Sequence, residues 1–201
     1  MLRYLTTTGI VFYFILYGVS ASRYPGGNQI DHQEAGFSWA QNYGCNLFNE
    51  QALNGQINPA RPFAILANLI LCVAIAWFFV RYGSKHPVSK KWSRITQIAG
   101  VFSMFFASIL FTRFHDITSI LSGIFGVIAL WGVYMGLQKD QQYSLIRYGF
   151  ICFILIAVNN AIYFSEKGIY YLPVIQKITL VVILSWVVLV ENGMATSIKN
   201  I

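Results

Sequence analysis

Six long apolar runs, separated by polar segments, dominate the hydrophobic pattern of the chain. They span about residues 4–20, 63–82, 95–112, 117–137, 145–164 and 170–190. Runs of about 18–20 apolar residues have the length of a helix that crosses a hydrocarbon core of roughly 30 Å. The roughly 10-residue alternating segments of a membrane β-barrel are not visible. The pattern predicts an all-α, polytopic membrane protein with six transmembrane helices, as a single integral membrane domain over residues 1–201.

The first apolar run has a second interpretation, as a signal peptide. Arg3 precedes it, and Val19-Ser20-Ala21 resembles a small-residue cleavage site. The run is long and aromatic for the hydrophobic region of a signal peptide, which favours a retained helix. Cleavage would leave five helices with unchanged orientations.

A long polar segment, residues 21–62, follows the first run and predicts a structured outer loop. Within it, apolar side chains recur at helical steps of three to four residues, at Trp39, Tyr43, Leu47 and Phe48. We expect a helix over residues 38–51, with Ser38 as its N-cap. This helix could be a lid over an outer pocket or could lie on the bilayer surface, and the surface position is the more typical one.

The composition supports a membrane location. The chain is 56% hydrophobic and 10% charged, whereas soluble domains are about 25% charged. The net charge of +7 is explained by basic cytoplasmic loops rather than by nucleic-acid binding. Because basic residues gather on the cytoplasmic side of membrane proteins, both termini are predicted to be cytoplasmic. Nine of the 14 basic residues are then inside: Arg3, Arg81, Lys85, Lys90, Lys91, Arg94, Lys139, Arg147 and Lys199.

With that topology, the polar residues near the membrane gather on the outer side. They are Asn68, Arg113, His115, Asp116, Asn159, Asn160, Glu166 and Lys177, below a loop that carries Trp39 and Tyr43. Ionisable residues within membrane segments mark functional sites by default. We expect an outer-leaflet pocket in which Lys177 pairs with Asp116 or Glu166. Three structural explanations compete: snorkelling of basic side chains, asparagine bridges between helices and capping of a helix by Asp116. Ser122 and Gly126 have the small-xxx-small spacing of helix packing.

A catalytic or metal site is a weaker alternative. His115 could act as a base oriented by Asp116, but adjacent residues at a helix start rarely face each other. A zinc site needs about three protein ligands, for which His32, His115 and Asp31 are the weak candidates. No motif of a known hydrolase, phosphate-binding loop or redox site occurs. No cofactor is predicted.

Several short motifs of the outer loop carry a family resemblance. They are Tyr24-Pro25-Gly26-Gly27, Gly36-Phe37-Ser38-Trp39, Asn42-Tyr43-Gly44-Cys45-Asn46-Leu47 and Asn54-Gly55, followed by the His115-Asp116 turn. Together they resemble an uncharacterised bacterial family of six-span membrane proteins related to the Frag/DRAM/Sfk group. The resemblance implies a six-helix membrane fold and no established activity. Asn46 stands where this family would have an acidic residue.

Three functional hypotheses follow, and whether the protein is an enzyme stays open. The first is a multi-pass protein of a bacterial cytoplasmic membrane that binds a lipid headgroup or a membrane-protein partner in the outer pocket. The second is a membrane-embedded lipid hydrolase or transferase that uses His115 and Asp116. The third is a small-solute transporter, which would need a cavity reaching past Asn159 to the inner face.

Overall fold

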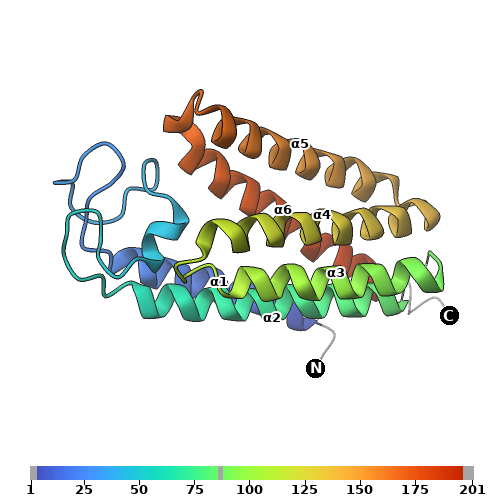
Figure 1. Ribbon diagram of the computed structural model, residues 1–201. Coiled ribbons are helices and arrows are strands. Elements are labelled where there is room, and N and C mark those ends of the chain that lie inside the picture. The colour runs from blue at the N-terminus through green and yellow to red at the C-terminus, as the bar shows by residue number, and fades with distance from the viewer. Residues whose placement is uncertain (1–3, 86–87, 197–201) are drawn as a thin grey trace.

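The computed structural model describes residues 4–85 and 88–196, and these fold as a bundle of six long helices (Figure 1). The helices are α1 (Leu5–Ser22), α2 (Arg61–Lys85), α3 (Lys90–Ser108), α4 (His115–Lys139), α5 (Tyr143–Ser165) and α6 (Leu172–Thr196). Two short 3₁₀ helices, η2 (Gly44–Phe48) and η3 (Ile169–Tyr171), complete the described elements. The predicted all-α class is confirmed.

Five segments are long and apolar enough to cross a membrane: Leu5–Ser22, Arg61–Lys85, His115–Lys139, Tyr143–Ser165 and Ile169–Gly193. The sixth long helix, α3, differs because it contains Lys90, Lys91 and Arg94. The apolar run had predicted a helix that starts only at residue 95, after these basic residues. The helix begins earlier because the Ser89 hydroxyl accepts a hydrogen bond from the Trp92 amide, a typical N-cap. The chain is therefore a multi-pass membrane protein with five or six spans.

The helices pack in two groups. Consecutive helices from α1 to α4 lie side by side, and α5 and α6 form a hairpin (Figure 1). We call the end of the bundle that carries residues 23–60 the loop end, and the opposite end, where α2, α4 and α6 finish, the basic end. The α5–α6 hairpin diverges from α4 toward the loop end, whereas α4 and α5 meet at the basic end (Figure 1).

Small residues let α3 and α4 approach closely. A methyl group on Gly132 of α4 would overlap the Thr96 side chain of α3. Nearer the loop end, the Ser103 hydroxyl donates to the Ser122 carbonyl at 2.9 Å, opposite Gly126. The helix-packing role predicted for this pair is confirmed at Gly126, and Ser122 takes part through its main-chain carbonyl.

The loop between α1 and α2 contains no helix over residues 38–51, so that prediction is wrong. The only helix in that range is the short η2, and Ser38 does not cap it. Buried asparagines instead bind the main chain: Asn42 donates to the Gly27 carbonyl at 2.9 Å, and Asn58 donates to the Asn49 carbonyl at 2.9 Å. Side-chain amides that bond local backbone groups compete with helix formation. The apolar residues that suggested a helical face include Leu47, which is buried in a small loop core with Tyr24.

Candidate functional site

A cavity of about 490 Å³ lies inside the bundle, toward the loop end. Its walls come from α1, α2, α3, α4, α6 and η2, and none of its lining residues belongs to α5. The volume falls within the roughly 300–1,000 Å³ of small-molecule sites. Most of the wall is apolar, with Leu71, Ile75, Leu130, Leu180 and Ile183 among the lining side chains. The cavity can therefore accept a hydrophobic group.

The polar part of the same wall lies mainly near the loop end. His115 and Ser119 come from the start of α4, while Gln176 and Lys177 come from the start of α6. Asn68 contributes from α2. The cavity thus has one polar end and a long apolar interior, which is the distribution of chemistry along an amphiphile.

A second cavity of about 360 Å³ adjoins the first one at the loop end. The two share Cys45, Phe48, Leu110 and His115. The second cavity adds three charged side chains, which are Glu50, Arg61 and Arg113. Arg61 contacts Glu50 at 3.2 Å and donates through Nε to the Phe48 carbonyl at 3.0 Å, so its charge is already partnered.

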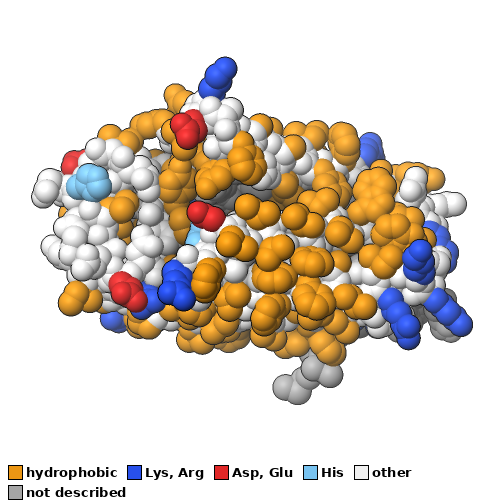
Figure 2. Space-filling view, in the orientation of Figure 1, with side chains coloured by type: hydrophobic (Ala, Val, Ile, Leu, Met, Phe, Trp, Pro, Cys, Tyr) orange, Lys and Arg blue, Asp and Glu red, His pale blue; other side chains and the backbone are white. Residues whose placement is uncertain are grey.

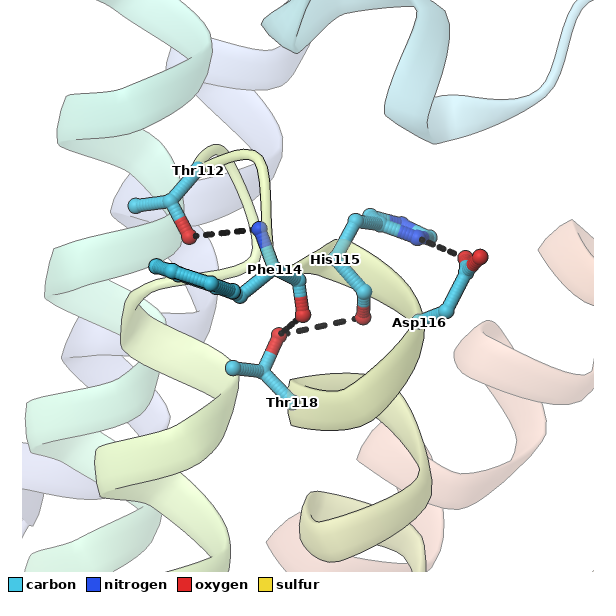
Figure 3. A network of polar contacts seen from close by, with 5 residues as sticks. All are labelled: Thr112, Phe114, His115, Asp116 and Thr118. Carbon is cyan, nitrogen blue, oxygen red and sulfur yellow. Dashed lines mark hydrogen bonds and ion pairs between the residues drawn. The ribbon is translucent and has the colours of Figure 1, made fainter.

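His115 and Asp116 are in direct contact at the start of α4. The distance from His115 Nδ1 to Asp116 Oδ1 is 3.1 Å (Figure 3). The expectation that these neighbours would not face each other is therefore wrong. The next turn is fixed because the Thr118 hydroxyl bonds the carbonyls of Phe114 and His115 at 3.0 Å. Both side chains point to the side of α4 that faces the α5–α6 hairpin, below η2 (Figure 3).

This contact has the geometry of a base and its orienting carboxylate. The Asp116 side chain is 82% exposed and the His115 side chain 43% exposed. A polar contact this open to the surroundings contributes little free energy in water. The contact positions the imidazole at the wall that the two cavities share.

Lys177 does not pair with Asp116 or Glu166 as predicted. Its ammonium group donates to the main-chain carbonyl of Asn42 and to that of Pro173, the latter at 3.1 Å. It also lies 5.5 Å from the centre of the Phe37 ring, within the range of a cation–π contact. A carbonyl partner satisfies the donors but leaves the positive charge without a counter-ion.

Three of the predicted polar residues serve the helices rather than the cavity. Asn159 of α5 donates to the Thr179 hydroxyl of α6 at 2.6 Å, so it joins the hairpin. Asn160 is exposed and bonds only the Ile156 carbonyl of its own helix. Glu166 is an exposed C-terminal cap of α5 with a left-handed backbone, φ 57°. Of the predicted asparagines, only Asn68 reaches the cavity, where it also joins α2 to α3 through the Ala107 carbonyl at 2.9 Å.

The loop aromatics lie beside the cavity rather than in it. Trp39 is 56% exposed and packs against Phe37, with ring centres 5.3 Å apart. Tyr43 lines a separate cavity of about 280 Å³ between the loop and the η3 segment. Neither residue is among the lining of the main cavity, so the structure does not bring them together with Lys177 and His115 there.

The candidate metal ligands are dispersed. His32 Nδ1 lies 2.7 Å from the Leu53 carbonyl, and Asp31 Oδ1 accepts from the Gln33 amide at 2.8 Å. Across the part of the chain that the structure describes, no group of three His, Cys, Asp or Glu side chains could hold a metal ion.

Two features of the bundle were missed in the sequence. Cys45 lies at the junction of both cavities, and burial raises the pKa of its thiol. At the basic end, Glu191 is fully buried: it accepts from the amide and hydroxyl of Thr7 at 3.0 and 2.6 Å, and Arg81 contacts it at 3.5 Å. The sequence shows Glu191 as an acid directly after an apolar run. We had predicted that the helix ends there, whereas α6 continues to Thr196.

Comparisons with known proteins assign no family: no family model, no curated protein and no solved structure matches the chain. The resemblance to the six-span bacterial family stays a prediction.

Proposed function

We propose that this protein binds a membrane amphiphile, with the hydrophobic part in the main cavity and the headgroup at its polar end. The observation that carries the proposal is the 490 Å³ cavity itself, which is apolar inside and bordered by His115, Gln176 and Lys177 at the loop end. Small-molecule sites are typically apolar with a few placed polar groups. The bilayer supplies molecules of this composition at high local concentration.

The proposed orientation has the loop end on the outside of a bacterial cytoplasmic membrane and both termini inside. Figure 2 shows a group of Lys and Arg side chains at the basic end and others toward the loop end, where the Asp and Glu side chains visible in this view also lie. Basic residues near helix ends favour the cytoplasmic side. The polar end of the cavity would then lie at the depth of the outer headgroups.

A membrane-embedded hydrolase or transferase is the second candidate, and the His115–Asp116 contact favours it. In that case His115 would act as the base at the cavity wall. Cys45 is a poor nucleophile beside it, because burial raises the pKa of the thiol and keeps it protonated. A transport pathway finds less support: Tyr82, Val133 and Trp186 are almost fully buried toward the basic end, where Tyr82 donates to the Val133 carbonyl at 2.9 Å.

The experiment that tests amphiphile binding uses one variant whose new side chain fills the cavity and one matched control variant. Leu180 lines the cavity, while Leu189 on the same helix is 45% exposed. We expect the wild-type protein to retain lipid through purification in detergent, detected by native mass spectrometry. Leu180→Trp should lose most of that lipid, and Leu189→Trp should retain it. Equal retention by both variants, or no retained lipid in the wild type, would contradict the proposal.

A further inference from the structure

The main cavity has a side facing the bilayer. Helices α4 and α6 both line it, yet α5 does not, although α5 packs on α6. Because the hairpin diverges from α4 toward the loop end, the two lining helices separate where the polar groups lie (Figure 1). Figure 2 shows the surface hollowed in this region, between the apolar side chains of α4 and those of the hairpin, next to an acidic side chain.

The helices that border this opening carry exposed apolar side chains on the surface that faces away from the cavity. Ile117, Ile120 and Ile124 on α4 are each more than half exposed, and so is Phe164 near the end of α5. Apolar side chains exposed on membrane-spanning helices face acyl chains in the bilayer. An acyl chain in the bilayer could therefore reach the opening along apolar side chains.

Two cations near the polar end have no carboxylate partner among the described contacts. Arg113, in the wall of the second cavity, is exposed, and its guanidinium lies 4.9 Å from the centre of the Phe114 ring. Lys177, in the wall of the main cavity, binds only main-chain carbonyls and the Phe37 ring. By contrast, Arg61 is occupied by Glu50, and Asp116 contacts His115.

We propose that the bound amphiphile is an anionic, phosphate-bearing lipid that enters sideways from the bilayer between α4 and α6. Its phosphate lies between Arg113 and Lys177, and its acyl chain occupies the main cavity. Arginine matches phosphate by paired hydrogen bonds, while lysine acts as a compact charge. The inference rests on the proposed amphiphile binding and specifies the ligand class and its route.

The test offers full-length protein two lipids with identical acyl chains. One has an anionic phosphoglycerol headgroup and the other a zwitterionic phosphocholine headgroup, mixed equally in detergent micelles, and bound lipid is counted by native mass spectrometry. We expect the wild type to prefer the anionic lipid by about tenfold, or about 1.4 kcal/mol, because both headgroups carry a phosphate but the choline ammonium adds a positive charge beside Arg113 and Lys177. Arg113→Gln and Lys177→Gln should each lower the preference, and the double variant should remove it.

Arg147→Gln is the matched control, because Arg147 is an exposed cation near the basic end. Its lipid preference should equal that of the wild type. Since Lys177 also bonds the loop, Arg113→Gln provides a variant with no such role, and Lys177→Arg should restore the preference that Lys177→Gln loses. A wild type that retains both lipids equally would overturn this inference but leave amphiphile binding intact. A wild type that retains neither would overturn both.

A competition with glycerol phosphate distinguishes a lipid from a soluble anion. If the anion enters from the aqueous side and needs no acyl chain, glycerol phosphate at millimolar concentration displaces the bound lipid, and the sideways route is wrong. We expect no displacement, because the apolar cavity contributes most of the binding free energy.

Discussion

At the scale of the residue, most buried polar side chains in this bundle join segments together. Asn68 links α2 to α3 and Lys177 links α6 to the loop. The sequence identified both as unusual for an apolar run, and both line the main cavity. What it could not identify was the partner, because Lys177 bonds the carbonyl of Asn42, 135 positions away. Every residue has a main-chain carbonyl, so no residue type marks this partner in the sequence. The partners predicted instead, Asp116 and Glu166, could be considered because their side chains are acidic.

Glu191 is the residue for which we expect the largest loss of stability on substitution. Its carboxylate satisfies the amide and hydroxyl of Thr7 and contacts Arg81, all within the packed basic end. Glu191→Ala removes one partner of a buried ion pair, which typically destabilises by about 3–5 kcal/mol. Thermal unfolding in detergent should show a large decrease in melting temperature.

The control for that measurement is Glu50→Ala. Glu50 also contacts an arginine, Arg61, but its side chain is 80% exposed, and exposed ion pairs contribute about 0–1 kcal/mol. We expect little change in melting temperature. Similar decreases for both variants would show that burial of Glu191 is not the cause of its effect.

At the scale of the element, helix existence was predictable and helix ends were less so. All six apolar runs form helices, because a helix satisfies the backbone N–H and C=O groups of a long apolar segment within the segment itself. The start of α3 moved to Lys90 because a serine cap outweighs the loss of apolar character. The loop was misread because buried asparagines, among them Asn42 and Asn58, hold an irregular backbone.

The α5–α6 hairpin offers a matched pair of adjacent asparagines. Asn159 bonds Thr179 across the hairpin, whereas Asn160 is exposed and bonds only its own helix. Hydrogen bonds between membrane helices contribute about 0.6 kcal/mol on average and up to about 2 kcal/mol. Asn159→Ala should therefore lower the melting temperature, and Asn160→Ala should not. A larger decrease for Asn160→Ala would contradict the contact assigned to the hairpin.

At the scale of the whole molecule, the sequence predicted a polar pocket at one end of the bundle but not the long apolar interior of the cavity. Hydrophobic periodicity cannot distinguish a helix that packs tightly from one that diverges, and the cavity arises where α6 separates from α4. Its lining residues, such as Leu130 and Ile183, are ordinary apolar side chains in the sequence. The sequence identified His115 and Lys177 as candidate site residues. The structure adds that both line the same apolar cavity.

The orientation of the whole molecule in the membrane can be tested without knowing the ligand. In a variant whose native cysteines are replaced, a single cysteine is introduced at Gln33 in the loop or at Gln142 between α4 and α5, both exposed positions. A membrane-impermeant maleimide should label Gln33→Cys in intact cells and Gln142→Cys only after the membrane is opened, because basic residues near helix ends favour the cytoplasmic side. The reverse pattern would place the polar end of the cavity in the inner leaflet, and the anionic ligand would then come from there.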